Sequence, residues 1–356
     1  MSTRRAAQSD FAIAVVRWQK KHGRHGLPWQ NTRDAYRIWL SEIMLQQTQV
    51  AAVIPYYERF LKRFPDLAAL AAASEDDVLA LWSGLGYYSR ARNLHRAAQL
   101  IAAAHGGRFP RDFDAVLALP GIGRSTAAAV CVFAFGARHA ILDGNVKRVF
   151  ARCFGVAGYP GDSAVADELW RHAERLTPAK NIEAYTQGLM DLGAGVCTRT
   201  KPRCDECPLT KQCVARRQNA IAKYPAPRPR KVLPQRRTRM LVLLHAGQVL
   251  LEKRPSSGIW GGLWSLPETG LRDDVVAACK TRYGVTPATC RPLPPVVHGF
   301  THFRLEIEPL RVAVKKIEPR AAAPGAVWLS LEDAAAAALP APVRRILAAL
   351  ATPLNP

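Results

Sequence analysis

The chain has 356 residues, 49% of them hydrophobic, and a formal net charge of +22 at pH 7. This length predicts two domains, each large enough to bury a core. Such an excess of positive charge indicates a polyanionic partner, which is nucleic acid or an anionic membrane. No apolar run reaches the roughly 18 residues of a membrane-spanning helix, and the start has no signal-peptide core. We therefore expect no membrane association and a cytoplasmic location.

Helical spacing of apolar residues dominates from Phe11 to about Thr210. Within this region, residues 119–130 (LPGIGRSTAAAV) form a glycine-punctuated turn that leads into an alanine-rich helix. The turn lacks the Lys-Ser/Thr pair of a nucleotide-triphosphate loop, and Thr126 stands where a dinucleotide loop needs a third glycine. The preceding stretch, DFDAVLALP, carries apolar residues at helical intervals. The sequence therefore predicts a helix-turn-helix hairpin.

Half of the eight cysteines fall in one short segment with the spacing Cys-x6-Cys-x2-Cys-x5-Cys; they are Cys197, Cys204, Cys207 and Cys213. Clustered cysteines in a chain without a secretion signal indicate a metal centre rather than disulfides. Zinc and a [4Fe-4S] cluster both accept four thiolates, so the spacing leaves both open. The loop between the first two cysteines carries three cations, Arg199, Lys201 and Arg203, which suit a phosphate backbone. The alternative is a metal centre that only holds the fold together.

Residues 223–239 (KYPAPRPRKVLPQRRTR) contain seven basic residues, four prolines and no acid, which predicts an extended cationic linker. Beyond it, MLVLLHAGQVLLEKR reads as two strands around a tight turn, and FTHFRLEIE alternates apolar and charged residues. The helical stretches DDVVAACKTRYG and APVRRILAALA follow. We predict a helical region at 1–222, the linker at 223–239 and an α+β domain at 240–356.

The hairpin, the segment LDGNVKRV and the cysteine spacing together resemble the helix-hairpin-helix DNA glycosylases of the endonuclease III-like superfamily, which carry a [4Fe-4S] cluster. Within that superfamily, LPWQ, WLSEIMLQQTQV and GLGYYSRARNL resemble the adenine DNA glycosylase (MutY-type) family. The resemblance is dense over residues 25–215. It implies a mainly α glycosylase fold and favours [4Fe-4S] over zinc.

Two carboxylates lie in unlike surroundings. Glu42 sits mid-helix among Ile38, Trp39 and Leu45, and burial there should raise its pKa. Asp143 precedes a helix, and capping should keep it ionised. N-glycosidic cleavage passes through an oxocarbenium-like state, which a proton donor and a charged carboxylate both assist. The resemblance implies that Glu42 protonates the departing adenine and activates water, while Asp143 stabilises or traps the sugar cation. The alternatives are a solvated helix glutamate and an ordinary capping aspartate.

The base must leave the duplex before either carboxylate can reach it. The resemblance implies that Gln47 and Tyr87 fill the gap and that Trp29 and Gln187 lie near the extruded adenine.

The hairpin amides around Gly121 and Gly123 are placed to hold phosphates of a DNA strand. Ser125 occupies the position at which bifunctional relatives of the endonuclease III type carry a lysine that attacks the sugar. Because a hydroxyl cannot form an imine, the resemblance implies a monofunctional enzyme. Lys147 is expected to face a phosphate.

The stretch GIWGGLWSLPE followed by a helix resembles a Nudix fold. A nucleotide pyrophosphohydrolase is disfavoured, because the positions that should supply metal-binding glutamates hold Ala277, Lys280 and Thr281. In similar glycosylases this domain recognises 8-oxoguanine through a Phe-Ser-His loop. Here the corresponding residues are Phe300, Thr301 and His302, and by resemblance Thr48 and Leu85 complete the contacts.

The resemblance thus implies a monofunctional glycosylase that excises adenine opposite 8-oxoguanine and, more weakly, opposite guanine. We expect a bacterial, nucleoid-associated monomer that acts on double-stranded DNA. The alternatives are a bifunctional endonuclease III-like glycosylase and AP lyase, and a non-enzymatic iron-sulfur DNA-binding redox sensor. Ser125 and the second domain argue against the first, and Glu42 with Asp143 argues against the second.

Overall fold

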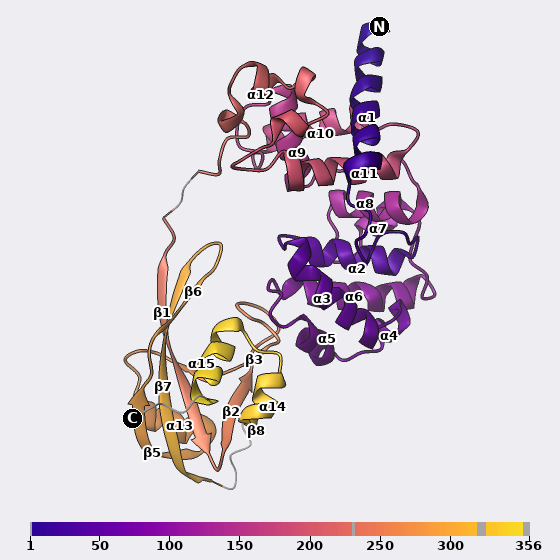
Figure 1. The fold of residues 1–356 in the computed structure, drawn as a ribbon. Helices are drawn as coiled ribbons and strands as arrows, with labels where there is room; N and C mark the ends of the chain where they lie inside the picture. Colours follow the sequence, from indigo (N-terminus) through magenta and orange to yellow (C-terminus); the bar gives the residue numbers. More distant parts are fainter. Residues whose placement is uncertain (1, 230–231, 319–324, 352–356) are drawn as a thin grey trace. The chain divides into compact units, whose positions relative to one another are not determined.

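A computed structural model describes residues 2–229, 232–318 and 325–351 of the chain, which forms two compact units (Figure 1). The first unit comprises residues 1–72 and 93–230, and the second comprises 73–92 and 231–356. Residues 73–92 therefore group with the C-terminal unit, although the sequence places them within the predicted helical region.

Helices build the chain up to residue 229, as the apolar spacing predicts. Among the described residues, the first strand begins only at Gln235. In chain order the longer helices are α1 (Ser2–His22), α2 (Ala35–Leu45), α3 (Val50–Arg63), α4 (Leu67–Ala71), α5 (Glu75–Trp82), α6 (Ser89–Ala104), α7 (Phe113–Leu117), α8 (Arg124–Phe135), α9 (Gly144–Phe154), α10 (Ser163–Leu176), α11 (Ile182–Asp191) and α12 (Val214–Arg217). Short 3-10 turns at Cys204–Glu206, Thr210–Gln212 and Ile221–Lys223 interrupt the cysteine-rich segment and the chain after it.

One buried cluster joins α1, α8, α9, α10 and α11. Its centre is aromatic: the Phe11 ring lies 5.9 Å from Phe150 and 6.5 Å from Tyr185 between centroids. Capping side chains fix where several helices start. Asp34 accepts hydrogen bonds from two free backbone amides at the start of α2. Helix α2 therefore begins at a defined residue.

The predicted hairpin is present as α7 and α8. Gly121 lies in the turn between them with a φ of +77°, and a Cβ there would lie 2.7 Å from Cβ of Asn93. Only glycine meets both conditions without strain. Gly123 is the N-cap of α8 and has an ordinary φ of −93°.

Helix α11 ends at Asp191 and is followed without a break by a π-helical turn, Leu192–Val196, after which comes Cys197. Gly193 in this turn packs against α9, because a Cβ on it would lie 2.5 Å from Cβ of Asn145. Single π-turns inside helices recur at functional sites.

The second unit contains an eight-stranded sheet with the central order β3-β2-β1-β7-β5. Its strands are β1 (Gln235–His245), β2 (Gln248–Lys253), β3 (Trp264–Ser265), β4 (Glu268–Thr269), β5 (Val285–Pro292), β6 (Val296–Gly299), β7 (Arg304–Ile317) and β8 (Ala326–Ser330). Three helices, α13 (Val275–Tyr283), α14 (Leu331–Ala336) and α15 (Ala341–Ala351), accompany it. The predicted hairpin strands are β1 and β2, and the predicted alternating strand is the start of β7, which pairs with β1 in parallel.

Strand β1 begins at Gln235, inside the segment predicted to be an extended linker. Two of that segment's arginines pair across the sheet: Arg237 lies 3.6 Å from Glu306, and Arg239 lies 3.9 Å from Glu308. These two cations are therefore not free to follow a phosphate backbone, because β-pairing brings acidic side chains opposite them. Residues 230 and 231 of the same segment lie outside the described residues.

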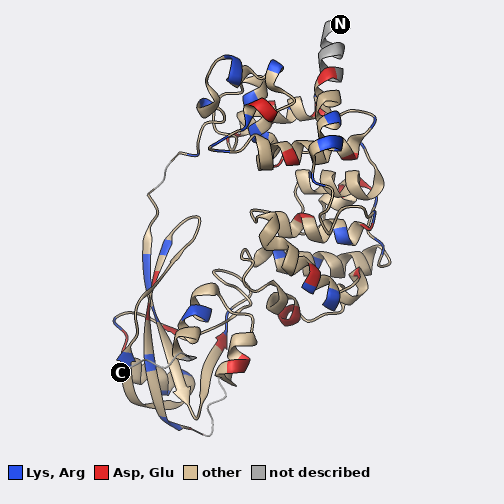
Figure 2. Cartoon of the chain, viewed as in Figure 1, with Lys and Arg blue, Asp and Glu red and all other residues tan. Residues whose placement is uncertain are grey.

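Lysine and arginine are distributed over both units (Figure 2). Within the described part of the chain, no helix combines the length and the apolar character needed to cross a bilayer.

Candidate active site

A pocket of about 590 Å³ opens in the first unit between α2, α11 and the loop that follows α1. Three of the residues predicted to act on the base line it together: Glu42, Trp29 and Gln187. Trp29 is 8% exposed, and its ring meets Tyr57 edge-on at 5.3 Å. An indole held in this way gives the pocket a rigid apolar wall.

Glu42 reaches the pocket from α2. Its neighbours Ile38 and Trp39 are buried, as the sequence predicts. Burial, and after it the negative charge of Asp143, raise the pKa of Glu42 to about 8. The carboxyl therefore retains a proton at neutral pH, which a general acid requires.

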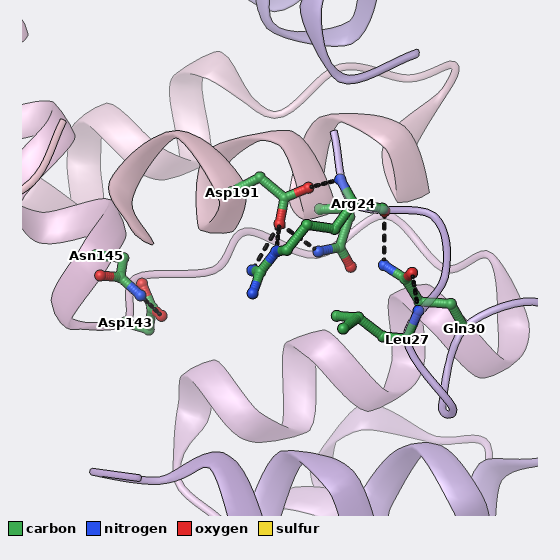
Figure 3. Close-up of polar contacts among 7 residues, drawn as sticks. Arg24, Leu27, Gln30, Asp143, Asn145 and Asp191 are labelled. Atoms are coloured by element: carbon green, nitrogen blue, oxygen red, sulfur yellow. Dashed lines mark hydrogen bonds and ion pairs between the residues drawn. The ribbon is translucent and has the colours of Figure 1, made fainter. Parts of the chain in front are cut away.

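Asp143 is the N-cap of α9, as predicted. Its Oδ1 accepts a hydrogen bond from the backbone amide of Val146 at 2.7 Å, and Oδ2 lies 3.5 Å from Nδ2 of Asn145 (Figure 3). These hydrogen bonds favour the ionised form. Burial is nevertheless the larger influence and raises the pKa of Asp143 above its ordinary value. Capping therefore does not depress the pKa of Asp143 as expected, because burial of its own carboxyl outweighs the hydrogen bonds that it accepts.

A further buried carboxylate, Asp191 at the end of α11, does not itself line this pocket but contacts two residues that do, Arg24 and Gln187. Sequence reasoning did not single it out. It accepts hydrogen bonds from the backbone amide of Arg24 at 2.9 Å and from the Arg24 guanidinium at 2.6 Å (Figure 3). Gln187 donates to it from Nε2 at 2.8 Å. The signal available in the sequence was an aspartate flanked by Met190 and Leu192 near a helix end.

Ser125 lies in the first turn of α8, where its Oγ accepts a hydrogen bond from the backbone amide of Leu142 at 3.0 Å. The hydroxyl thus supports the residue just before Asp143. Lys147, predicted to face a phosphate, donates from Nζ to the backbone carbonyl of Pro160 at 3.0 Å.

The residues predicted to enter the duplex lie in loops with unusual backbone. Gln47 and Tyr87 have φ angles of 57° and 50°, which non-glycine residues adopt rarely and mostly at functional sites. Gln47 is exposed, and Tyr87 keeps 46% of its surface open. Thr48 is partly exposed, whereas Leu85 keeps only 8% of its surface.

Phe300, Thr301 and His302 form the loop between β6 and β7, where the backbone amide of Phe300 donates to the carbonyl of Phe303 at 2.9 Å. The Phe300 ring is stacked on Phe303 at 4.4 Å and lies 5.4 Å from Trp260. Thr301 and His302 are exposed. The Thr301 hydroxyl lies 3.4 Å from Nδ1 of His302, so these two exposed polar groups are next to each other above the aromatic rings.

The four clustered cysteines line one small pocket together with Arg152. Arg152 is buried and donates to the backbone carbonyls of Thr198 and Arg199 and, at 3.3 Å, to Sγ of Cys197. Within the described residues, no three His, Cys, Asp or Glu side chains form a group that could hold a single metal ion.

The donor set of this pocket fits a cationic group. Burial, together with the charges of the other three cysteines, raises the pKa of the Cys207 thiol to about 11. Four thiolates therefore need compensating positive charge, which iron supplies in an iron-sulfur cluster. In the loop between the first two cysteines, Arg199 and Lys201 are exposed, whereas Arg203 forms an ion pair with Glu206 at 2.9 Å.

Comparison with protein families gives two matches. Residues 40–175 match the HhH-GPD superfamily of base excision DNA repair proteins, and residues 239–349 match a NUDIX domain. Among solved structures, a thermostable thymine-DNA glycosylase is 30% identical and covers 59% of this chain and 97% of its own, with a TM-score of 0.53. An endonuclease III–DNA complex, 21% identical with a TM-score of 0.50, covers 60% of this chain and 97% of its own and shares the fold.

Curated relatives extend over nearly the whole chain. The adenine DNA glycosylase of Buchnera aphidicola subsp. Acyrthosiphon pisum is 38% identical over 95% of this chain and 96% of its own length. The adenine DNA glycosylase of Homo sapiens is 32% identical over 94% of this chain and 73% of its own. This chain therefore belongs to the adenine DNA glycosylase family, whose members are enzymes that hydrolyse N-glycosyl bonds, and it joins a helix-hairpin-helix glycosylase domain to a NUDIX domain.

Proposed function

We propose that this protein is a monofunctional DNA glycosylase that extrudes adenine from duplex DNA and hydrolyses its N-glycosidic bond. The observation that carries the proposal is that Glu42, Trp29 and Gln187 line one pocket. Burial raises the pKa of Glu42 to about 8, and a carboxyl that retains its proton there is suited to protonate a departing base.

In the proposed reaction, Glu42 gives its proton to a ring nitrogen of adenine, and the bond between the base and C1′ breaks with its electron pair leaving on adenine. Asp143, in its ionised form, stabilises the resulting sugar cation or adds to C1′. Glu42, now a carboxylate, takes a proton from water, and the hydroxyl oxygen forms the new bond at C1′. If Asp143 has added to C1′, the bond between them breaks in this step and Asp143 leaves as a carboxylate. Each step conserves protons and charge.

Ser125 supports the assignment as a monofunctional enzyme. A lyase step requires an amine that forms an imine with C1′. The Ser125 hydroxyl cannot do so, and it is already engaged with the backbone amide of Leu142. Water is thus the proposed final acceptor of the sugar.

Cys197, Cys204, Cys207 and Cys213 are the proposed ligands of a [4Fe-4S] cluster. When bound, the cluster ties the cysteine loop into one rigid body. Arg152 donates hydrogen bonds to two backbone carbonyls of that loop. The exposed side chains of Arg199 and Lys201 would then be held in a fixed position from which they can bind a DNA phosphate.

We further propose that the preferred opposing base is 8-oxoguanine, with guanine a weaker alternative. The exposed Thr301 and His302 on their aromatic platform supply hydrogen-bonding groups for the modified base. Gln47 and Tyr87, exposed in strained loops, are the proposed residues that occupy the vacated stack.

The test uses the full chain on three duplexes, which carry adenine opposite 8-oxoguanine, adenine opposite guanine, and thymine glycol opposite adenine. Strand cleavage is compared with and without hot alkali. We expect alkali-dependent cleavage of the first duplex, slower cleavage of the second and none of the third. Glu42→Gln should lower the single-turnover rate by at least about 100-fold, the lower range for a general acid.

Cleavage without alkali at the rate of base loss, together with borohydride trapping of the whole enzyme, would instead identify a bifunctional lyase. An inactive wild-type protein that binds duplex DNA would favour the non-enzymatic role. Iron and acid-labile sulfide measured at four each per chain would support the cluster, and zinc in the same preparation would contradict it.

A further inference from the structure

The buried network around Asp191 carries an inference beyond the residues that face the base. The Asp191 side chain is 3% exposed. Its Oδ1 lies 2.6 Å from Nε and 2.6 Å from Nη2 of Arg24, and its Oδ2 accepts the Arg24 backbone amide at 2.9 Å. Two guanidinium nitrogens on one oxygen and a backbone amide on the other fix the carboxylate in one orientation.

The same network orders the wall of the pocket. The Arg24 carbonyl accepts a hydrogen bond from Nε2 of Gln30 at 2.9 Å, and Oε1 of Gln30 accepts the backbone amide of Leu27 at 3.0 Å (Figure 3). Arg24, Leu27 and Gln30 all line the base pocket. Asp191 is therefore the anchor of the loop that carries Trp29.

We propose that Asp191 is a positioning residue that fixes the side-chain amide of Gln187 and thereby sets which base the pocket accepts. Oδ1 of Asp191 already accepts from the Arg24 guanidinium, so the group of Gln187 that meets this oxygen must be the NH2 group, and it does so at 2.8 Å. The amide cannot flip without placing its oxygen against a buried carboxylate.

This orientation leaves Oε1 of Gln187 as the group available to the pocket. Within the part of the chain that the structure describes, Oε1 accepts no hydrogen bond. An acceptor matches the 6-amino group of adenine, which donates, and is mismatched to the 6-oxo group of hypoxanthine or guanine. The inference rests on the proposed function, because it assigns the base selectivity of that same site.

The test uses the full chain and three bases opposite 8-oxoguanine: adenine, hypoxanthine, and purine, which has neither donor nor acceptor at position 6. Single-turnover rates on purine serve as the reference. Asp191 Oδ1 accepts from both the Arg24 guanidinium and Gln187, and Oδ2 accepts from the Arg24 backbone amide. Asp191→Asn supplies one acceptor oxygen in place of two, so the Gln187 amide is no longer held in one orientation and can present its NH2 group to the pocket. We expect the adenine-to-purine ratio to fall about tenfold or more and the hypoxanthine-to-purine ratio to rise.

A double-mutant cycle separates positioning from general damage. Gln187→Met removes the amide at similar length and should abolish the dependence on the 6-substituent. If Asp191 acts through Gln187, Asp191→Asn adds no further change in these ratios on that background. Asp66→Asn, which alters an exposed capping aspartate at the start of α4, is the matched control and should leave all ratios unchanged.

Equal losses on all three bases in Asp191→Asn would overturn the proposal and assign Asp191 a structural role only. If that variant does not fold, hydrogen exchange of the wild-type side-chain amides decides. The Gln187 NH2 group should exchange more slowly than that of exposed Gln47, and equal rates would contradict the fixed amide. A wild-type protein inactive on adenine would refute the proposed function instead, a result distinct from unchanged ratios.

Discussion

At the scale of single residues, Glu42 combines a functional need with a cost in stability. Its pKa rises from an ordinary value of 4.5 to about 8 because the folded protein buries it beside Asp143. Below pH 4.5 the carboxyl is protonated in both folded and unfolded chains. Between pH 4.5 and about 8, only the unfolded chain ionises, so the stabilising contribution of the protonated form is lost progressively as pH rises.

Glu42→Gln should therefore be more stable than wild type, with a difference that grows from pH 4.5 to about 8 and is constant above it. A tenfold change in proton affinity corresponds to about 1.4 kcal/mol, and partial access of solvent to the pocket reduces the effect. We expect a gain on the order of 1–3 kcal/mol at pH 8. Urea unfolding at several pH values measures it, and a pH-independent difference would contradict the pKa argument.

The sequence singles out candidate residues more readily than it predicts how their side chains are held. Glu42 and Asp143 could be found because each lies within a local motif, a carboxylate in an apolar helix and a cap before a helix. Asp191 could not, because its partner Arg24 is 167 residues away and the pairing exists only in the folded chain. The hydrogen bond from the backbone amide of Leu142 to the Ser125 hydroxyl could not be predicted for the same reason.

At the scale of elements, the hairpin offers a matched pair of glycines. Gly121→Ala introduces a Cβ at a φ of +77° and 2.7 Å from Cβ of Asn93, so it should lower stability by about 1–3 kcal/mol and weaken DNA binding. Gly123→Ala has no atom within 4 Å of its new Cβ and an ordinary φ. Thermal unfolding should therefore change little in Gly123→Ala, and equal losses in the two variants would refute this account of the turn.

Helices and strands could be predicted where periodicity is strong, but their limits depend on partners elsewhere in the chain. The apolar spacing predicted α8, β2 and β7. The start of β1 at Gln235 could not be predicted, because a proline-rich basic segment reads as a linker until Glu306 and Glu308 of β7 lie opposite its arginines. Tertiary pairing overrides local composition there.

At the scale of the whole molecule, the net charge of +22 predicts a steep salt dependence of DNA binding. If about 6–10 phosphates are contacted, affinity should fall by roughly 10³–10⁵ between about 50 and 200 mM salt. Fluorescence anisotropy on a duplex without a mispair measures the slope. Arg199→Gln and Lys201→Gln should each reduce the slope by about 1, whereas an unchanged slope would mean that the cysteine loop does not contact DNA.

The π-helical turn Leu192–Val196 makes the first unit sensitive to the number of residues between α11 and the cysteine loop. It separates Asp191, the last residue of α11, from Cys197, the first clustered cysteine. A π-turn holds one residue more than an α-helical turn, and each residue rotates a helix by about 100°. Its length therefore sets how the cysteine loop is rotated about the helix axis relative to the pocket that Gln187 lines. Deleting one residue there would remove none of the proposed site residues. It would nevertheless rotate the cysteine loop relative to the pocket.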